Sequence, residues 1–282
     1  MAAVTTGGAL RGVRPVPPRR AVLIGAIRSE LTKIRSVRST YASLGVMVLA
    51  SIIWAAIFCA GTAAHWAHMS AQVRGGVDPT QNSVQGLALV GQLVMVVLGA
   101  LTITAEYSTG MMRTSLTVLP RRGVVYGGKA LVLAAVALAA TFPASFLCFF
   151  VGQGFLASTH AGATLSQPGV LRAVTATALL VTLTGLFALG LGAVLRNTAG
   201  AIAAAYGTLF LIPELARALP TPWLNDAQRW LPGGYLVAQI TTTNPGGFIP
   251  HMFFPWGELA VYAGYTAALL VAGAIVLRRR DA

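Results

Sequence analysis

The 282-residue sequence is poor in charged residues, and above all in acidic ones. Only 7 residues are Asp or Glu against 20 that are Lys or Arg, and 10% of the chain is charged while 56% is apolar. An enzyme built on clustered carboxylates would need more acidic residues than this, and closer together. The composition instead indicates an all-α, polytopic membrane protein.

Cysteine is also scarce, and carboxylates are missing from the interiors of the apolar runs. Both cysteines, Cys59 and Cys148, lie inside such runs, where buried thiols are expected rather than a disulfide. Glu106, Glu214 and Glu258 all lie at the ends of runs. An ion-coupled transporter usually holds an acid within the membrane, so energy for any transport is expected from outside it.

Six apolar runs are long enough to cross a hydrocarbon core of about 30 Å. We place the six spans of one transmembrane domain, residues 41–282, at 41–64, 84–105, 130–152, 173–195, 199–219 and 259–277. The fifth is the weakest, because residues 199–212 rise only about 21 Å. It must continue past Pro213, taking Glu214 and Arg217 to its outer end, or form a broken helix.

The basic residues are divided unevenly between the two sides of the membrane. Sixteen lie in the first forty residues, the second–third connection, the fourth–fifth turn and the C-terminal tail, against four in the opposite segments. Because Lys and Arg accumulate on the cytoplasmic side, both termini are predicted to be cytoplasmic. The first run starts too late and is too long for a cleavable signal peptide. We expect the plasma membrane of a bacterium.

Residues 1–20 have the composition of a disordered basic tail, whereas residues 21–40 are amphipathic. Apolar and charged side chains recur there at helical spacing on largely opposite sides: Ile24, Ile27, Leu31 and Ile34 against Arg28, Glu30, Lys33 and Arg35. This pattern predicts an interfacial helix in the headgroup plane, drawn to anionic lipid. The alternative is a basic flank that only sets orientation.

The connection between the second and third spans carries helix signals: Ser108 or Thr109 as a cap, Glu106 near the positive end and Pro120 as a stop. We predict a short helix that offers Glu106 and Arg113 to the cytoplasm as a docking surface. The alternative is an interfacial loop whose arginines contact lipid phosphate.

Three stretches resemble the membrane subunits of type-2 ABC exporters. They are Glu-Tyr-Ser-Thr-Gly-Met-Met-Arg at 106–113, Pro-Arg-Arg at 120–122 followed by Lys129-Ala130, and Arg-Ser-Glu-Leu-Thr-Lys-Ile-Arg at 28–35. The resemblance implies a permease whose second–third connection holds a coupling helix in a cleft of a cytoplasmic ATPase. It implies coupling residues Glu106, Tyr107, Gly110, Met112 and Arg113, and a smaller second contact at Arg196 and Asn197.

The resemblance also implies the partners. Two ATPase chains would bind ATP and magnesium, a second permease copy or homologue would complete the pathway, and lipid would surround it; nucleic acid is not expected. The chain itself is expected to be no enzyme and to bind no cofactor or metal. Two alternatives stay open: a non-transporting anchor or sensor subunit, and a lipid-modifying membrane enzyme.

Two motifs are near misses. Gly123–Ala130 almost spells a phosphate-binding loop, but Ala130 replaces the hydroxyl that would hold magnesium and no strand precedes it. His65 and His68 could share a metal on a helix, but no clear third ligand is nearby. The aromatic outer segment 220–257 is expected to lie at or dip into the outer leaflet, either capping a pathway or simply anchoring a loop.

Overall fold

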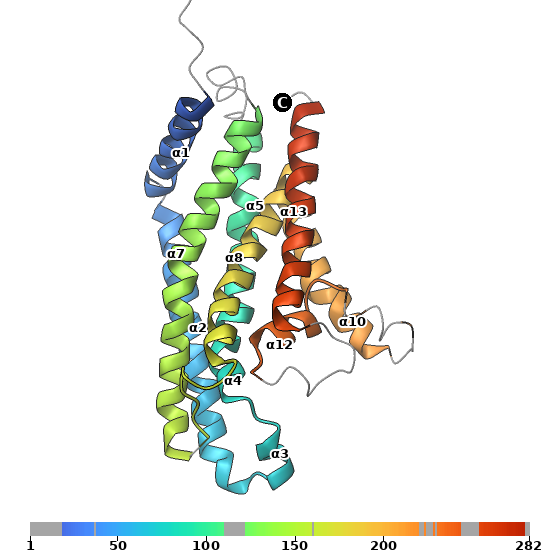
Figure 1. Cartoon of the computed structure of the whole chain (residues 1–282). Coiled ribbons are helices and arrows are strands. Elements are labelled where there is room, and N and C mark those ends of the chain that lie inside the picture. Colours follow the sequence, from blue (N-terminus) through green and yellow to red (C-terminus); the bar gives the residue numbers. More distant parts are fainter. Residues whose placement is uncertain are drawn as a thin grey trace, which may run out of the picture.

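The computed structural model describes residues 19–36, 38–109, 122–159, 161–219, 223, 228, 230–243 and 254–279. Every regular element in this part of the chain is helical, and six helical segments are long and apolar enough to cross a membrane. They run side by side along one long axis (Figure 1). The prediction of an all-α fold with six spans is therefore confirmed.

The elements follow one another as α1 (Arg19–Ser36), α2 (Arg38–His65), η1 (Trp66–His68), α3 (Ala71–Gly75), α4 (Pro79–Gly86), η2 (Leu87–Gly91), α5 (Gln92–Ser108), α7 (Arg122–Leu156), η3 (Ala157–Thr159), α8 (Val170–Leu195), α9 (Thr198–Tyr206), η4 (Gly207–Leu211), α10 (Ile212–Ala218), α12 (Tyr235–Thr241) and α13 (Pro255–Arg279). The spanning segments are Arg38–His68, Pro79–Ser108, Gly123–Thr159, Val170–Leu195, Thr198–Ala218 and Pro255–Arg279. Each expected span matches one of them.

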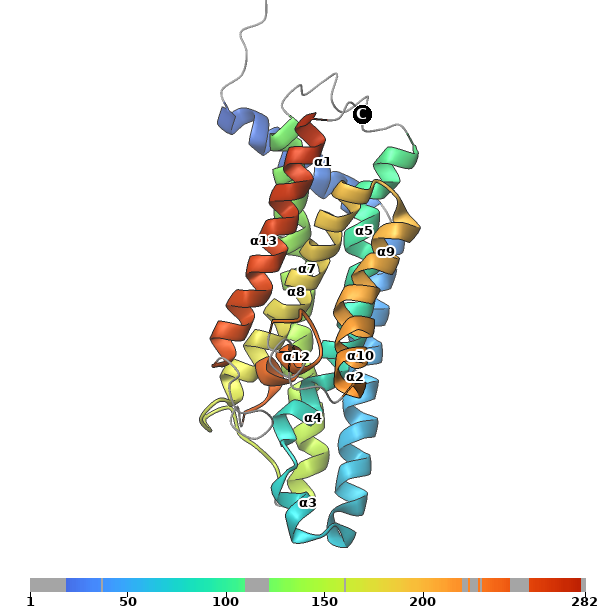
Figure 2. The same cartoon turned by 90° about the vertical axis from the view of Figure 1, so that its right-hand side faces the viewer.

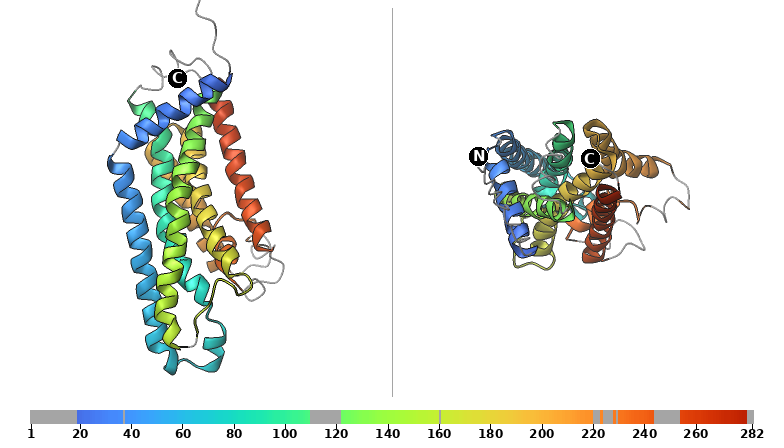
Figure 3. Two further views of the ribbon diagram at one scale, coloured as in Figure 1. Left: turned by 60° about the vertical axis from the view of Figure 1, so that its left-hand side comes forward. Right: turned by 90° about the horizontal axis from the view of Figure 1, so that it is seen from above.

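The described chain begins in α1 and ends in α13 at the same end of the bundle (Figures 1 and 3). We call this the α1 end; it is the end that the basic residues predict to be cytoplasmic. The opposite end, where α3 lies, is the α3 end. Helices α2 and α7 reach further toward the α3 end than α13 does (Figures 1 and 2).

The third and fifth spans differ most from a simple apolar run. The third starts seven residues earlier than expected, because α7 already begins within the polar connection at Arg122. The fifth continues past Pro213 to Ala218, so the continuous helix is the correct alternative. Just before Pro213 the helix widens into the π-helical turn η4. Proline has no N–H to donate to the carbonyl of Leu209, so a local rearrangement is expected there.

The backbone at Gly233 lies directly against this turn. A Cβ on Gly233 would lie only 2.0 Å from the carbonyl oxygen of Leu209, and its φ of +127° is one that side chains rarely adopt. The backbone before α12 therefore packs directly against the fifth span. Within α12, Leu236 and Ile240 are fully buried, so this helix packs into the bundle.

Helix α8 forms the centre of the bundle, since it contacts α5, α7, α9, α12 and α13. It approaches α5 most closely where Gly99 faces Gly185: a Cβ on Gly99 would lie 2.0 Å from the carbonyl oxygen of Gly185. Small residues at a crossing let two backbones touch, which favours helix association in a membrane. The backbones of α5 and α8 are therefore in close contact at this crossing.

At the α3 end, Asp78 joins α4 to the segment that follows α12. One carboxylate oxygen caps α4 by accepting from the backbone N–H groups of Thr80 and Gln81, both at 3.0 Å. The other oxygen accepts from the hydroxyls of Thr242 and Thr243, at 2.7 and 2.9 Å, and from the N–H of Thr243. A single half-buried side chain thus ties two segments that are far apart in sequence.

Helix α1 lies across the α1 end, over α7 (Figure 3). Its exposed side chains include Ile24, Arg28 and Leu31, which share one face at helical spacing. Glu30 is buried, with 6% of its surface exposed, and faces the bundle together with Lys33. Glu30 and Lys33 thus lie on the side opposite Ile24 and Leu31, in agreement with the predicted pattern, whereas Arg28 is an exception that shares the outward face with the apolar residues. The placement of this helix in the headgroup plane stays a prediction.

Candidate functional site

The candidate site lies where α5 ends, next to the connection that the sequence singles out. Glu106 belongs to the last turn of α5 and is 6% exposed. The prediction that Glu106 faces the cytoplasm is therefore wrong. A carboxylate so poorly hydrated needs cationic partners, and the bundle provides two of them.

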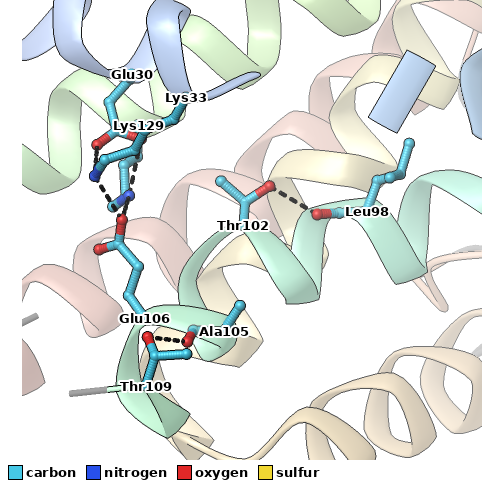
Figure 4. Close-up of polar contacts among 8 residues, drawn as sticks. All are labelled: Glu30, Lys33, Leu98, Thr102, Ala105, Glu106, Thr109 and Lys129. Atoms are coloured by element: carbon cyan, nitrogen blue, oxygen red, sulfur yellow. Dashed lines mark hydrogen bonds and ion pairs between the residues drawn. The ribbon is translucent and has the colours of Figure 1, made fainter. Parts of the chain in front are cut away.

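Four side chains from three helices form what we call the charge network: Glu30 and Lys33 of α1, Glu106 of α5 and Lys129 of α7 (Figure 4). The amino group of Lys129 lies 2.9 Å from Oε2 of Glu30 and 2.5 Å from Oε1 of Glu106. The amino group of Lys33 lies 2.9 Å from Oε1 of Glu30 and 2.8 Å from the same Glu106 oxygen. Two positive and two negative groups leave the network with no net charge.

Burial makes this network different from a surface ion pair. The side chain of Lys129 is 1% exposed and those of Glu30 and Glu106 are 7% and 8% exposed, whereas Lys33 is 37% exposed. Removing one partner from such a group leaves an uncompensated buried charge, which is strongly destabilising. The network therefore favours one arrangement of α1, α5 and α7.

Lys129 was not among the residues singled out as functional from the sequence. It is the lysine of the near-miss phosphate-binding loop, and the structure places it in the third turn of α7 with its amino group held by two carboxylates. The scarcity of acidic residues is the sequence feature that could have identified Lys129 as a functional residue. Glu30 and Glu106 are two of only 7 in the chain, and a lysine at the start of a span needs a counter-charge.

The environment of Lys33 raises its pKa. Partial burial acts to lower the pKa, but hydrogen bonds and charge from Glu106 and Glu30 outweigh it and the net shift is upward. Lys33 is therefore fully protonated at neutral pH.

The last turn of α5 is also joined to the turn between α8 and α9. The guanidinium of Arg196 lies over the ring of Tyr107, 5.1 Å from its centroid. One turn earlier, the hydroxyl of Thr198 donates to the hydroxyl of Thr104 at 2.8 Å. Arg196 adopts a left-handed conformation with φ of +54° as it ends α8, and Asn197 caps α9 by accepting from Gly200.

The predicted site residues thus fall into three groups. Five of them come together around the end of α5: Glu106, Tyr107, Glu30, Lys33 and Arg196. Two others lie apart from this cluster, because Asn197 caps α9 and Arg28 is exposed on α1. Gly110, Met112, Arg113 and the side chain of Arg35 lie outside the described residues. The predicted coupling helix therefore stays a prediction.

Comparison with known proteins gives no family assignment. No protein-family model matches the sequence, and a search of curated proteins finds no match. The function has to be argued from the membrane-spanning fold and from the contacts around the end of α5.

Proposed function

We propose that the chain is the membrane-spanning permease subunit of an ATP-driven ABC exporter. In this proposal a separate cytoplasmic ATPase docks on the connection between α5 and α7. The observation that carries the proposal is the anchoring of the last turn of α5 to α1, α7 and the α8–α9 turn. The resemblance of residues 106–113 and 28–35 to type-2 exporters supports it.

The contacts around the end of α5 would allow the connection between α5 and α7 to transmit a movement of the ATPase to the bundle. Glu106 lies two residues before Ser108, where α5 ends, and Lys129 lies seven residues after Arg122, where α7 begins. Any displacement of the connection therefore acts on both members of the shortest ion pair in the charge network. Packed helices move as rigid bodies, so a push on this connection would shift α5 and α7 together with α1.

The positions of the acidic residues also support an external energy source. Glu106 lies in the last turn of its span, and Glu258 lies in the first turn of the sixth span. Glu214 lies on α10, near the end of the fifth span, where its exposed carboxylate pairs with Arg217. A proton or sodium relay requires ionisable groups deeper in the membrane. An ATPase acting from the α1 end does not.

The experiment is purification of the tagged chain from its own membranes in mild detergent, followed by an ATP hydrolysis assay on the copurifying chain. Arg113→Glu is expected to reduce recovery of that chain at least tenfold, since charge reversal at a docking surface opposes association. The matched control is Arg217→Glu, an arginine near the far end of the fifth span. Equal recovery with both variants would refute the docking site.

A copurifying chain without ATPase activity would refute the exporter proposal. It would favour the alternative of an anchor or sensor subunit. Glu106→Gln tests transmission rather than docking: the amount of ATPase chain recovered per folded permease chain should persist, while stimulation of hydrolysis by a transported molecule should fall.

A further inference from the structure

A second feature of the α1 end is an open apolar groove lined by residues of α1, α2 and α7. It has a volume of about 660 Å³, within the range of ligand sites. We call it the inner groove. Its walls are Leu31 of α1, Tyr41, Leu44, Gly45, Val48, Leu49 and Ile52 of α2, and Val136, Ala139 and Ala140 of α7.

The inner groove is hollow because small residues face each other across it. Gly45 on α2 has no side chain, and a Cβ built there would meet no atom within 4 Å. On the facing helix, Ala139 and Ala140 carry only methyl groups. Helix α1 crosses the bundle above α2 and α7 and contributes Leu31 to the mouth of the groove (Figure 3).

The length of the inner groove matches one leaflet of a bilayer. From Tyr41 at its mouth to Ile52 at its far end, α2 rises about 16 Å. The hydrocarbon core of a bilayer is about 30 Å thick, so the groove is about as long as one leaflet of that core is deep. An extended acyl chain has this length and needs an apolar wall.

Two arginines lie one helical turn from residues that line the groove. Arg28 is one helical turn from Leu31 on the outward face of α1, and Arg38 is one turn before Tyr41 at the start of α2; both are exposed. Neither forms an ion pair with an acidic side chain in the described part of the chain. Glu30, the acidic residue of α1, is already held by Lys33 and Lys129.

We propose that the inner groove is a binding site for an anionic phospholipid of the adjoining leaflet. One acyl chain lies along Gly45 between α2 and α7, and the phosphate and headgroup are held by Arg28 and Arg38, with the Tyr41 hydroxyl at the same level. Arginine suits this role because its guanidinium can bind a phosphate through two hydrogen bonds. The inference requires only that the bundle spans a membrane, and it does not depend on the proposed exporter function.

The site is tested on the full chain purified in detergent. Native mass spectrometry would compare retention of dioleoylphosphatidylglycerol and dioleoylphosphatidylcholine, whose acyl chains are identical. We expect the anionic lipid to bind at least tenfold more tightly. Replacing Arg28 and Arg38 by glutamine should weaken its binding about fivefold for each arginine and leave phosphatidylcholine binding unchanged.

The groove itself is tested by filling it. Gly45→Phe introduces a ring into the open space and should abolish the preferred binding of phosphatidylglycerol without disturbing the fold. Gly61→Phe is the matched control, because Gly61 lies on the same helix outside the groove and a Cβ there also meets nothing within 4 Å.

The outcomes separate the sources of binding. Equal retention of the two lipids would show ordinary boundary lipid and overturn the proposal. Anionic preference that survives Gly45→Phe would place the phosphate contact on α1 without the groove, and would also overturn it. Loss of the preference in Gly45→Phe but not in Gly61→Phe would support the site.

Discussion

Replacing Lys129 by methionine is the sharpest perturbation of the charge network. Methionine has a similar length and no charge, so the variant leaves Glu30 and Glu106 buried beside one remaining cation, Lys33. The network then carries a net negative charge in a site where its two carboxylates are less than a tenth exposed. We expect a loss of about 3–5 kcal/mol of stability, the usual cost of breaking a buried ion pair.

A second substitution should return part of this loss. In the double variant Lys129→Met with Glu106→Gln, the remaining pair is Lys33 with Glu30, whose charged atoms lie 2.9 Å apart. The network is again neutral, so the double variant is expected to be no less stable than Lys129→Met alone. The two substitutions would then be non-additive by at least the loss of stability that Glu106→Gln causes alone, as expected for residues in one ion-pair network.

Thermal unfolding in detergent measures these differences; about 1 kcal/mol corresponds to roughly 2–4 °C in a domain of this size. The control is Glu214→Gln, which breaks a pair with Arg217 at the same 2.9 Å but with side chains 60% and 46% exposed. An exposed pair contributes at most about 1 kcal/mol. Equal losses for Lys129→Met and Glu214→Gln would refute the argument that burial makes the network essential.

Three further predictions concern other parts of the bundle. The pKa of Lys33 is raised, so the stability that its charge contributes is fully present below its ordinary pKa of 10.5 and is lost only as pH rises through the folded-state pKa. Lys33→Met should therefore lower the unfolding temperature equally at pH 6 and pH 9, and by less at strongly alkaline pH. Asp78→Asn keeps the cap on α4 but loses the acceptor that binds the segment after α12, and should cost about 1–3 kcal/mol in the same unfolding assay. Gly99→Ala should cost at least 1–3 kcal/mol, a range typical of overpacked cores, because its Cβ would lie 2.0 Å from the carbonyl oxygen of Gly185. Gly264→Ala, where a Cβ meets nothing within 4 Å, should change the unfolding temperature by less than about 1 °C.

The spans could be predicted from sequence because a membrane accepts only helices with an internally satisfied backbone. Their ends could not, because helical hydrogen bonds continue into polar residues that a hydropathy pattern excludes. The start of α7 shows this: Gly123 and Lys129 are helical although they precede the apolar run. The continuation of the fifth span past Pro213 likewise depends on the π-helical turn before it and on Gly233 packing against Leu209.

The site was predicted only in part, for a different physical reason. The sequence indicated that Glu106 matters but placed it on the surface, because local helix signals say nothing about what crosses above a span. Its partners lie on α1 and α7, 73 and 23 residues away in sequence. Only the packing of α1 across the bundle brings Glu30 and Lys33 to Lys129, and that packing is a property of the tertiary structure.

The most direct test of the exporter proposal is site-specific crosslinking through Arg113→Cys. The background is low, since the two native thiols, Cys59 and Cys148, are buried. The proposal predicts that Arg113→Cys crosslinks to a copurifying chain that hydrolyses ATP, and that Val73→Cys, 54% exposed at the α3 end, does not. If no ATP-hydrolysing chain is crosslinked, or if both cysteines capture it equally, the proposed role of this connection is contradicted.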